Sequence, residues 1–396
     1  MLRKACAALS QKLRPVVSLS KSRVETLSLL IIGMASARTV NLTHIASERP
    51  SDVKVASSYR RLQRFFQHVR PGQDWTANVV IGLLGIKGPW VLCLDRTNWK
   101  VGSRDVNILL LAVVTRRHRV PLLWTVLDKA GTSDTAERTA LMRRYLAIFG
   151  ASSIKFLLAD REFIGAEWFN FLNDNNIPFA IRIKERFRVT GEDGRDLPIA
   201  LLLRKTRRAQ QFSGRLNGTG THPAIRLNFA AKRLANGEWL VVASNRDGAA
   251  ALKAYRKRWA IECLFGDAKT RGFNLEDTRL TNPEKIDLLL GVLALAMAWA
   301  SKTAARLIGT KKNPRKSHGY YAKSWFRIGF DHLRHMLRNN PENALACWNA
   351  LKPQKMRVVL CVRFQQRAIN HLKNNNTSNK TLNIPQQIST ALASAA

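Results

Sequence analysis

Apolar and polar positions follow a helical period over the first part of the chain. Between 23 and 37 apolar residues occupy every side of the helical wheel, which predicts one buried helix. A short helix capped by Asn41 is expected to follow and to end near Glu48. After a break at 49–52, the period predicts a third helix over 55–69, which is amphipathic and basic.

The polar face of this third helix is rich in arginine. It holds Arg60, Arg61, Arg64 and Gln67. A helix, a tight break and a basic amphipathic helix are typical of a helix-turn-helix reader of DNA, which makes the three arginines candidates for DNA-end contacts. A basic helical bundle that touches phosphates alone fits equally well, because the break carries no diagnostic glycine. Both interpretations stay open.

From Trp90 onward, short apolar runs replace the helical pattern. The expected order is three strands, a helix, a strand, a helix and a strand, over residues 90–95, 106–115, 120–126, 134–149, 154–159, 164–173 and 179–183. This order predicts an α/β fold class with a ribonuclease-H-like mixed sheet. The first strand is expected to end in Asp95 and the fourth to be followed by Asp160. Since adjacent strand ends meet in one sheet, the two carboxylates should lie side by side.

The second half of the chain changes pattern twice. Residues 184–246 hold six glycines among short alternating runs, which is typical of a β-rich insertion. A long apolar helix is expected over 284–308, and residues 300–396 carry 17 basic against 2 acidic side chains. The final residues, rich in Asn, Ser, Thr and Ala, predict a disordered tail.

These patterns divide the chain into six predicted segments. They are a helical DNA-end-binding domain (1–75), the first part of the core (88–183), the β-rich insertion (184–246), the completion of the core with the helix that carries Glu262 (247–310), a basic helical region (311–375) and a tail (376–396).

The charge of the chain narrows the class of partner. Its 396 residues hold 65 Lys and Arg against 27 Asp and Glu, a net charge of +38. Such an excess of positive charge in a chain that is 46% hydrophobic indicates a folded protein that binds a polyanion, and nucleic acid is the first candidate. Ribosomal and chromatin proteins are as basic, but they are usually shorter and poorer in tryptophan than this chain, which has ten. Size and core content therefore favour an enzyme acting on nucleic acid.

Cysteine content and hydropathy argue against other classes. Five cysteines without a C-x-x-C pair do not suit a disulfide framework or a zinc site, and they indicate a reducing compartment. The longest uncharged apolar runs, 26–37 and 288–301, are shorter than the ~20 residues that span a bilayer. We therefore expect no transmembrane segment.

The stretch 255–269, YRKRWAIECLFGDAK, carries the densest chemistry of the chain. On a helix that turns about 100° per residue, its polar residues fall within one stripe about 60° wide, namely Tyr255, Arg258, Glu262 and Lys269. The other sides hold residues expected to pack against a core, namely Trp259, Ile261, Leu264 and Phe265. The stripe suits a phosphodiester, because Arg, Lys and Tyr bind phosphate oxygens and a carboxylate can hold a divalent metal. A solvated face with an ion pair between Arg258 and Glu262 fits the spacing as well.

The intervals between the four polar residues resemble the Y-R-E-K signature of a large group of bacterial insertion-sequence DDE transposases. The resemblance covers most of residues 20–300 and requires an aspartate at the end of two core strands, which Asp95 and Asp160 supply. It departs from the family at Glu162, where a small residue is usual. The resemblance implies that Asp95, Asp160 and Glu262 are catalytic and bind two Mg²⁺ ions, for which Mn²⁺ can substitute. Taken singly, an Asp that ends a strand would need no such role.

The resemblance also implies DNA contacts. Tyr255, Arg258 and Lys269 would hold backbone phosphates, and Trp239, in a strand of the insertion, would receive a base flipped out of a DNA hairpin. From the residues alone, a packed aromatic in a β-strand is the better interpretation of Trp239.

Taken together, the resemblance implies a cut-and-paste transposase that binds the ends of an insertion sequence, cleaves them and transfers them into target DNA. Its partners would be double-stranded DNA and, on paired ends, a second copy of the chain, with no membrane. Its location would be the bacterial cytoplasm, at the nucleoid. A metal-dependent nuclease on the same fold and a domesticated DNA-binding protein without chemistry are the alternatives, and the three intact carboxylates speak against the second.

Overall fold

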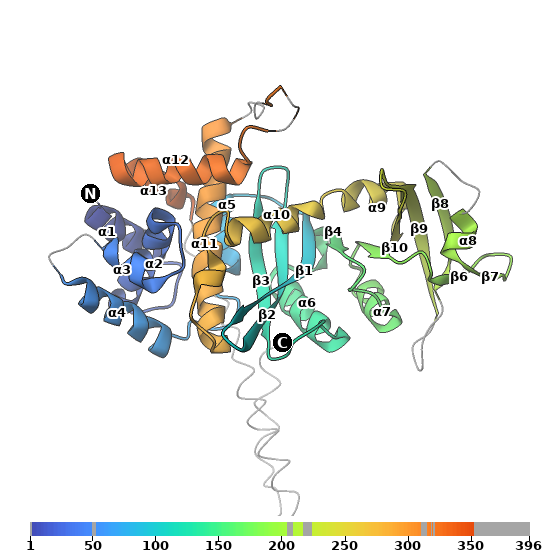
Figure 1. Cartoon of the computed structure of the whole chain (residues 1–396), viewed down its shortest axis with the longest axis horizontal. Coiled ribbons are helices and arrows are strands. Elements are labelled where there is room, and N and C mark those ends of the chain that lie inside the picture. Colours follow the sequence, from blue (N-terminus) through green and yellow to red (C-terminus); the bar gives the residue numbers. More distant parts are fainter. Residues whose placement is uncertain are drawn as a thin grey trace, which may run out of the picture. The chain divides into compact units, whose positions relative to one another are not determined.

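The computed structural model describes most of the chain up to residue 351 (Figure 1). Met1–Pro353 form one compact unit, and residues 354–396 lie outside the described residues. The residues that the structure describes are 2–49, 53–203, 209–216, 224–309, 315–317, 319 and 321–351. The prediction of a disordered tail over 376–396 and the part of the predicted basic region beyond 351 fall outside them.

The N-terminal segment is helical. Its helices are α1 (Leu2–Leu13), α2 (Lys21–Ala37), α3 (Leu42–Ser47), α4 (Val55–His68) and α5 (Ala77–Leu84). α2 is buried over almost its whole length, as its apolar wheel predicts. Asn41 caps α3 by accepting a hydrogen bond from the Thr43 N–H at 3.0 Å. The three helices predicted from the sequence are confirmed, and α1 and α5 add to them.

A mixed sheet follows these helices. Its first strands are β1 (Trp90–Val101), β2 (Arg104–Val114), β3 (Arg119–Leu127), β4 (Ile154–Ala159) and β5 (Phe179–Ile183). They lie in the order β3-β2-β1-β4-β5, with β1, β4 and β5 parallel and with antiparallel pairing of β2 to β1 and to β3. The intervening helices are α6 (Thr135–Phe149), the 3₁₀ turn η1 (Ala151–Ser153) and α7 (Ala166–Asp174). This is the order of strands and helices that the sequence predicts, and it is consistent with a ribonuclease-H-like core.

The β-rich insertion extends the same sheet. Its elements are β6 (Arg188–Thr190), β7 (Asp196–Pro198), α8 (Ile199–Leu203), β8 (Gln210–Leu216), β9 (Ile225–Arg233) and β10 (Trp239–Ser244). β10 pairs with β5, and the order continues as β5-β10-β9-β8-β6-β7, which gives a sheet of ten strands. Backbone hydrogen bonds between β5 and β10 therefore connect the insertion directly to the core, and the strands of the insertion lie on the far side of β4 from β1 (Figure 1). The domain boundaries stay predictions.

The helix expected over 255–269 is divided in two, which corrects the prediction. α9 (Gly248–Tyr255) ends where the polar stripe was expected to begin, and α10 (Trp259–Ala268) starts after a turn of three residues. Lys269 lies beyond α10 as its C-cap. The spacing of the stripe therefore reflects a turn between two helices, and no single helical wheel describes it.

The remaining helices pack around α11 (Pro283–Ile308). After η2 (Leu275–Asp277), α11 contacts β3, α5, α2 and α12 (Trp325–Asn339), and the described chain ends with α13 (Pro341–Leu345) and η3 (Ala346–Ala350). By length and composition α11 could cross a membrane, but 89% of its most apolar window is buried inside the fold. It is the long apolar helix predicted from the sequence, and it forms the centre of the helical core (Figure 1).

Candidate active site

Asp95 lies in the middle of β1, so the prediction that the strand ends there is wrong. The uninterrupted apolar run stops at Leu94, but pairing with β2 continues to Val101 opposite Arg104. Gly102, at a φ of 61°, turns the chain back directly, which keeps the two strands paired to their ends. β1 is therefore longer than the hydrophobic run that predicts it.

Asp160 directly follows β4, as predicted. β1 and β4 are parallel neighbours that pair Leu94 with Ala159, so the next residues along both strands, Asp95 and Asp160, lie beside each other. Their side chains are 15% and 29% exposed. A substrate can therefore reach both carboxylates.

One guanidinium connects the three carboxylates predicted to be catalytic. Arg258 Nη1 lies 3.2 Å from Asp95 Oδ2 and 3.8 Å from Asp160 Oδ2. Its Nη2 lies 2.9 Å from Glu262 Oε1. Arg258 is the N-cap of α10 and Glu262 lies four residues later, so the start of one helix supplies both side chains. The structure thus brings together Asp95, Asp160, Arg258 and Glu262.

Tyr255 joins this cluster from the end of α9. Its side chain is buried, and its hydroxyl donates a hydrogen bond to Asp160 Oδ1 at 3.4 Å. Burial and the neighbouring Asp160 carboxylate raise the pKa of the phenol above its ordinary value. Tyr255 therefore stays protonated at neutral pH and remains a hydrogen-bond donor.

Burial also acts on Asp95. It raises the pKa of this carboxyl to about 6, against the opposing effects of the Arg96 N–H, which donates to Oδ1 at 2.8 Å, and of Arg258. The negative charges of Glu262 and Glu162 raise it further. At neutral pH Asp95 is mostly ionised, in surroundings that favour a nearby cation.

A second polar network begins at Arg96, the residue after Asp95. Arg96 Nε donates to Glu162 Oε1 at 3.1 Å, and Arg96 Nη1 donates to Asn107 Oδ1 at 3.0 Å. The amide of the buried Asn107 donates to two backbone carbonyls of the loop after β3. The network joins the turn after Asp160 to the strand that carries Asp95. The departure from the family pattern at Glu162 is the one sequence signal for it.

Two predictions drawn from a single helical wheel over 255–269 need correction, namely that Lys269 shares a stripe with Glu262 and that Trp259 packs against the core. Lys269 does not contact the carboxylates: its Nζ donates to the Asn98 carbonyl at 3.2 Å and forms an ion pair with Glu276 at 2.8 Å, since it lies past the end of α10. Trp259, which the helical wheel assigns to the core, is 68% exposed, because the break before α10 changes which side of this helix is covered.

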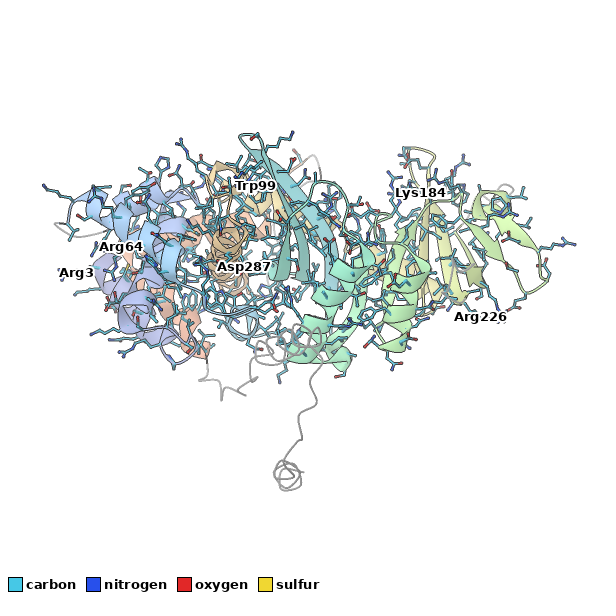
Figure 2. All side chains as sticks on the ribbon, turned by 90° about the horizontal axis from the view of Figure 1, so that it is seen from below. Arg3, Arg64, Trp99, Lys184, Arg226 and Asp287 are labelled. Atoms are coloured by element: carbon cyan, nitrogen blue, oxygen red, sulfur yellow. The ribbon has the colours of Figure 1, made fainter. Side chains whose placement is uncertain are left out.

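Trp239 and the N-terminal arginines lie outside this cluster. Trp239 is the first residue of β10 and is half-buried against the core. Arg61 binds α2: its Nε donates to Thr26 Oγ1 at 2.8 Å, and its guanidinium forms an ion pair with Glu25 at 3.3 Å. The Arg61 side chain therefore already has partners within the protein. Arg60 and Arg64 are exposed, and Figure 2 shows Arg64 on the helical segment. The DNA contacts assigned to these residues stay predictions.

The carboxylate cluster has the chemistry of a divalent metal site. Among the residues that the structure describes, no three Asp, Glu, His or Cys side chains are arranged to hold an ion between them, because the three carboxylates face Arg258. All of their donors are nevertheless oxygens, with which Mg²⁺ and Mn²⁺ are usually bound. One guanidinium also leaves three carboxylates incompletely neutralised. The donor set therefore fits a hard divalent cation.

Comparison with known proteins agrees with this geometry. Residues 86–299, more than half of the chain, match the family described as Transposase DDE domain. No curated protein matches the chain at a significant level. The matched range contains the whole cluster around Arg258 and ends inside α11, before α12.

Proposed function

The chain belongs to the transposase DDE family, whose members transfer phosphoryl groups on DNA, and we propose that it acts on the ends of a bacterial insertion sequence. In this proposal it cleaves each end through a DNA hairpin and joins the freed 3′-hydroxyl to target DNA. The observation that carries it is the convergence of Asp95, Asp160 and Glu262 on Arg258. Three carboxylates gathered at a place a substrate can reach are the groups that would hold metal ions for phosphoryl transfer on DNA.

Members of the family generally use divalent metal ions. Here Asp95, Asp160 and Glu262 would hold them, and the bound ions would supply the positive charge that activates the attacking oxygen and stabilises the leaving one. Two ions, Mg²⁺ or Mn²⁺, are our proposal. The protein itself contributes the position of the three carboxylates, which β1, β4 and α10 hold beside one another.

Arg258 and Tyr255 are proposed to bind the reacting phosphate. The guanidinium can exchange its carboxylate partners for phosphate oxygens, which it binds in the same two-pronged geometry. Tyr255, protonated and beside Asp160, can donate a hydrogen bond to the same group. Lys269, held by Glu276, would contact the backbone farther along the DNA.

Trp239 and the helical segment complete the proposal. Trp239 is half-buried at the start of β10, so part of its ring is available to stack on a flipped base. The N-terminal helices are proposed to bind the element end, with Arg60 and Arg64 against phosphates. On paired ends we propose a homodimer, in the bacterial cytoplasm at the nucleoid.

A strand-transfer reaction tests the function. The purified chain, a duplex carrying the terminal sequence of its own element and a supercoiled target plasmid are incubated with Mg²⁺. The proposal expects nicked ends, hairpin-closed ends and joined products. Nicking of both the end and unrelated duplexes, without joined products, would show a nuclease on this fold in place of a transposase.

A further inference from the structure

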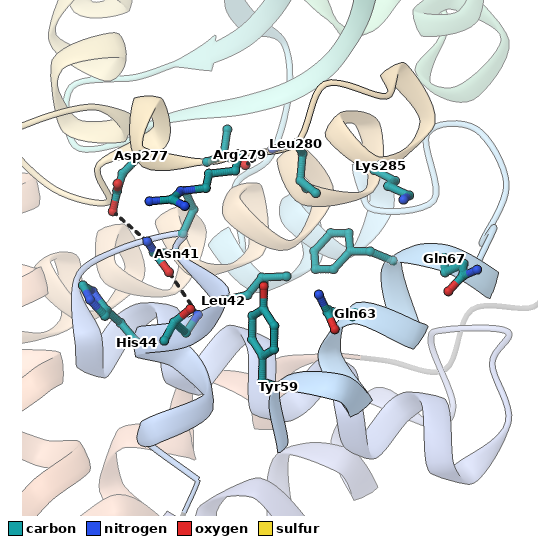
Figure 3. A pocket seen from close by; sticks show the side chains of 14 residues that line it. Asn41, Leu42, His44, Tyr59, Gln63, Gln67, Asp277, Arg279, Leu280 and Lys285 are labelled. Atoms are coloured by element: carbon teal, nitrogen blue, oxygen red, sulfur yellow. Dashed lines mark hydrogen bonds between the residues drawn. The ribbon is translucent and has the colours of Figure 1, made fainter. Parts of the chain in front are cut away.

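A pocket of about 660 Å³ with both polar and apolar lining lies between the N-terminal helices and the core (Figure 3). One wall is formed by α3 and α4, and the other by residues 277–285, which connect η2 to α11. This pocket lies outside the carboxylate cluster, and none of its lining residues belongs to that site. We call it the composite groove, because two segments far apart in the sequence build it.

The helical wall presents hydrogen-bonding groups in a row. Tyr59, Gln63 and Gln67 follow one another at intervals of four on α4, so they lie along one face of this helix. His44 of α3 joins them, and Figure 3 shows these side chains around the same space. None of the four has a side-chain hydrogen bond to another residue that the structure describes. Their polar groups are therefore available to a ligand.

The opposite wall is cationic. Arg279 is exposed and Lys285 is half-buried, and both line the groove. The acidic residue of the lining, Asp277, already accepts hydrogen bonds from Asn41 Nδ2 and Thr39 Oγ1, each at 3.3 Å. Two positive side chains therefore line the wall opposite the row of polar groups, and the carboxylate of Asp277 lies at the end of the pocket beside Asn41 (Figure 3).

We propose that the composite groove reads the sequence of the DNA end, an inference that rests on the proposed function. Glutamine offers a donor and an acceptor on one planar group and can pair with a base edge, while Arg279 and Lys285 bind the phosphates beside it. An acidic peptide would use the two cations but leave the amides of Gln63 and Gln67 without a partner. The combination of both walls favours DNA.

The groove is also connected to the active site. The Val40 N–H donates to the Phe273 carbonyl at 2.9 Å, just before α3 begins. Lys269, at the end of α10, pairs with Glu276 immediately before the groove wall. The helix that carries Glu262 and the surface that reads the DNA are thus joined through a short, hydrogen-bonded segment. DNA seated in the groove takes a defined register relative to the catalytic carboxylates.

Binding by the full chain tests the inference. Fluorescence anisotropy gives the ratio of affinities for a duplex with the element's terminal sequence and for a duplex of the same composition in scrambled order. Gln63→Ala combined with Gln67→Ala should lower this ratio about tenfold or more, because each lost base-edge contact costs ~1–3 kcal/mol of discrimination. Arg60→Ala combined with Arg64→Ala, on the same helix, is the matched control and should weaken both duplexes alike.

A second variant tests the cationic wall. Arg279→Ala combined with Lys285→Ala should weaken both duplexes and reduce the slope of log affinity against log salt by up to ~2. If the glutamine variant keeps the wild-type ratio of affinities, melting temperature and end cleavage, the proposal that the composite groove reads DNA sequence is wrong, while the proposed transposase function stands. A wild-type chain that neither prefers nor cleaves the terminal duplex contradicts the proposed function itself. Binding of an acidic peptide at the groove that displaces no DNA would also overturn the inference.

Discussion

Arg258 is the residue that connects the three carboxylates of the candidate active site. It contacts Asp95, Asp160 and Glu262 at 3.2, 3.8 and 2.9 Å, and its own side chain is 13% exposed. Without its charge, three carboxylates would repel one another in a partly buried space. The charge of Arg258 therefore stabilises the cluster. A divalent ion would compete with Arg258 for the carboxylates, and a DNA phosphate would compete with the carboxylates for Arg258.

This competition predicts a specific stability change. Arg258→Gln should lower the melting temperature in metal-free buffer, because the carboxylates lose their counter-charge. Mn²⁺ should then raise the melting temperature of the variant by more than it raises that of the wild type, since ions replace the missing cation. Differential scanning fluorimetry with and without Mn²⁺ measures both effects. Lys269→Gln, whose ion pair lies elsewhere, is the control, and equal Mn²⁺ shifts in Arg258→Gln and wild type would contradict the account.

The site residues differ in how far sequence could predict them. Asp160, Arg258 and Glu262 follow from a strand end and from local spacing, and the structure brings them together as expected. The network of Arg96, Glu162 and Asn107 joins positions far apart in the sequence, so no periodicity signals it. Asp95 follows from the apolar run before it and lies beside Asp160 as predicted, although β1 continues past it.

At the scale of elements, the hydrophobic pattern predicts the bounds of an element well where that element is regular. The strands over 154–159 and 179–183 have the predicted bounds, because each is a short and mostly buried apolar run. The prediction of one helix over 255–269 is wrong, because a turn of three residues separates α9 from α10 and changes which residues share a face. No proline or glycine marks this break in the sequence. The position of Lys269 and the exposure of Trp259 follow from that single turn.

The contact between α11 and α12 depends on a glycine. A Cβ added to Gly329 would clash with the Ala300 carbonyl oxygen and crowd Ala304, both on α11. Gly329→Ala should therefore destabilise the fold by ~1–3 kcal/mol, seen as a lower denaturation midpoint in urea. His335→Ala, on the exposed side of the same helix, should leave the midpoint nearly unchanged. A wild-type midpoint in Gly329→Ala would show that the helices can separate without cost.

The turn between β2 and β3 makes stability depend on pH. His118 is buried, with Nδ1 2.8 Å from Ser301 Oγ of α11, and burial together with the charges of Lys302 and Arg117 lowers its pKa to about 4. The pKa of this histidine in the unfolded chain is near 6.5, so between pH 6.5 and 4 the unfolded chain binds a proton at this position and the folded chain does not. Stability from this group is full above pH ~6.5 and declines as pH falls towards 4, by up to ~3 kcal/mol.

Replacing this histidine tests the pH dependence. His118→Gln should flatten the loss of unfolding free energy between pH 6.5 and 4.5 relative to wild type, measured by urea denaturation at each pH. His335→Gln, on the surface, serves as the control. Parallel stability profiles for wild type and His118→Gln would mean that other groups carry the acid sensitivity.

At the scale of the whole molecule, the net charge of +38 dominates DNA binding. Many phosphate contacts release many counterions, so affinity for any duplex should fall by ~10³-fold or more between 50 and 200 mM salt. Anisotropy titrations with a duplex of random sequence measure this. A weak dependence of affinity on salt would mean that few of the basic residues contact DNA phosphates.

The account as a whole depends on the three carboxylates, and single-turnover cleavage of the element end tests them most directly. Asp95→Asn, Asp160→Asn and Glu262→Gln keep side-chain size and remove the charge that we propose holds metal ions. Each should abolish nicking in Mg²⁺ while leaving DNA affinity and melting temperature close to wild type, because ligands of one centre act as a unit. Glu192→Gln, a surface change in the insertion, should cleave normally. Wild-type cleavage by any one of the three carboxylate variants would contradict the account.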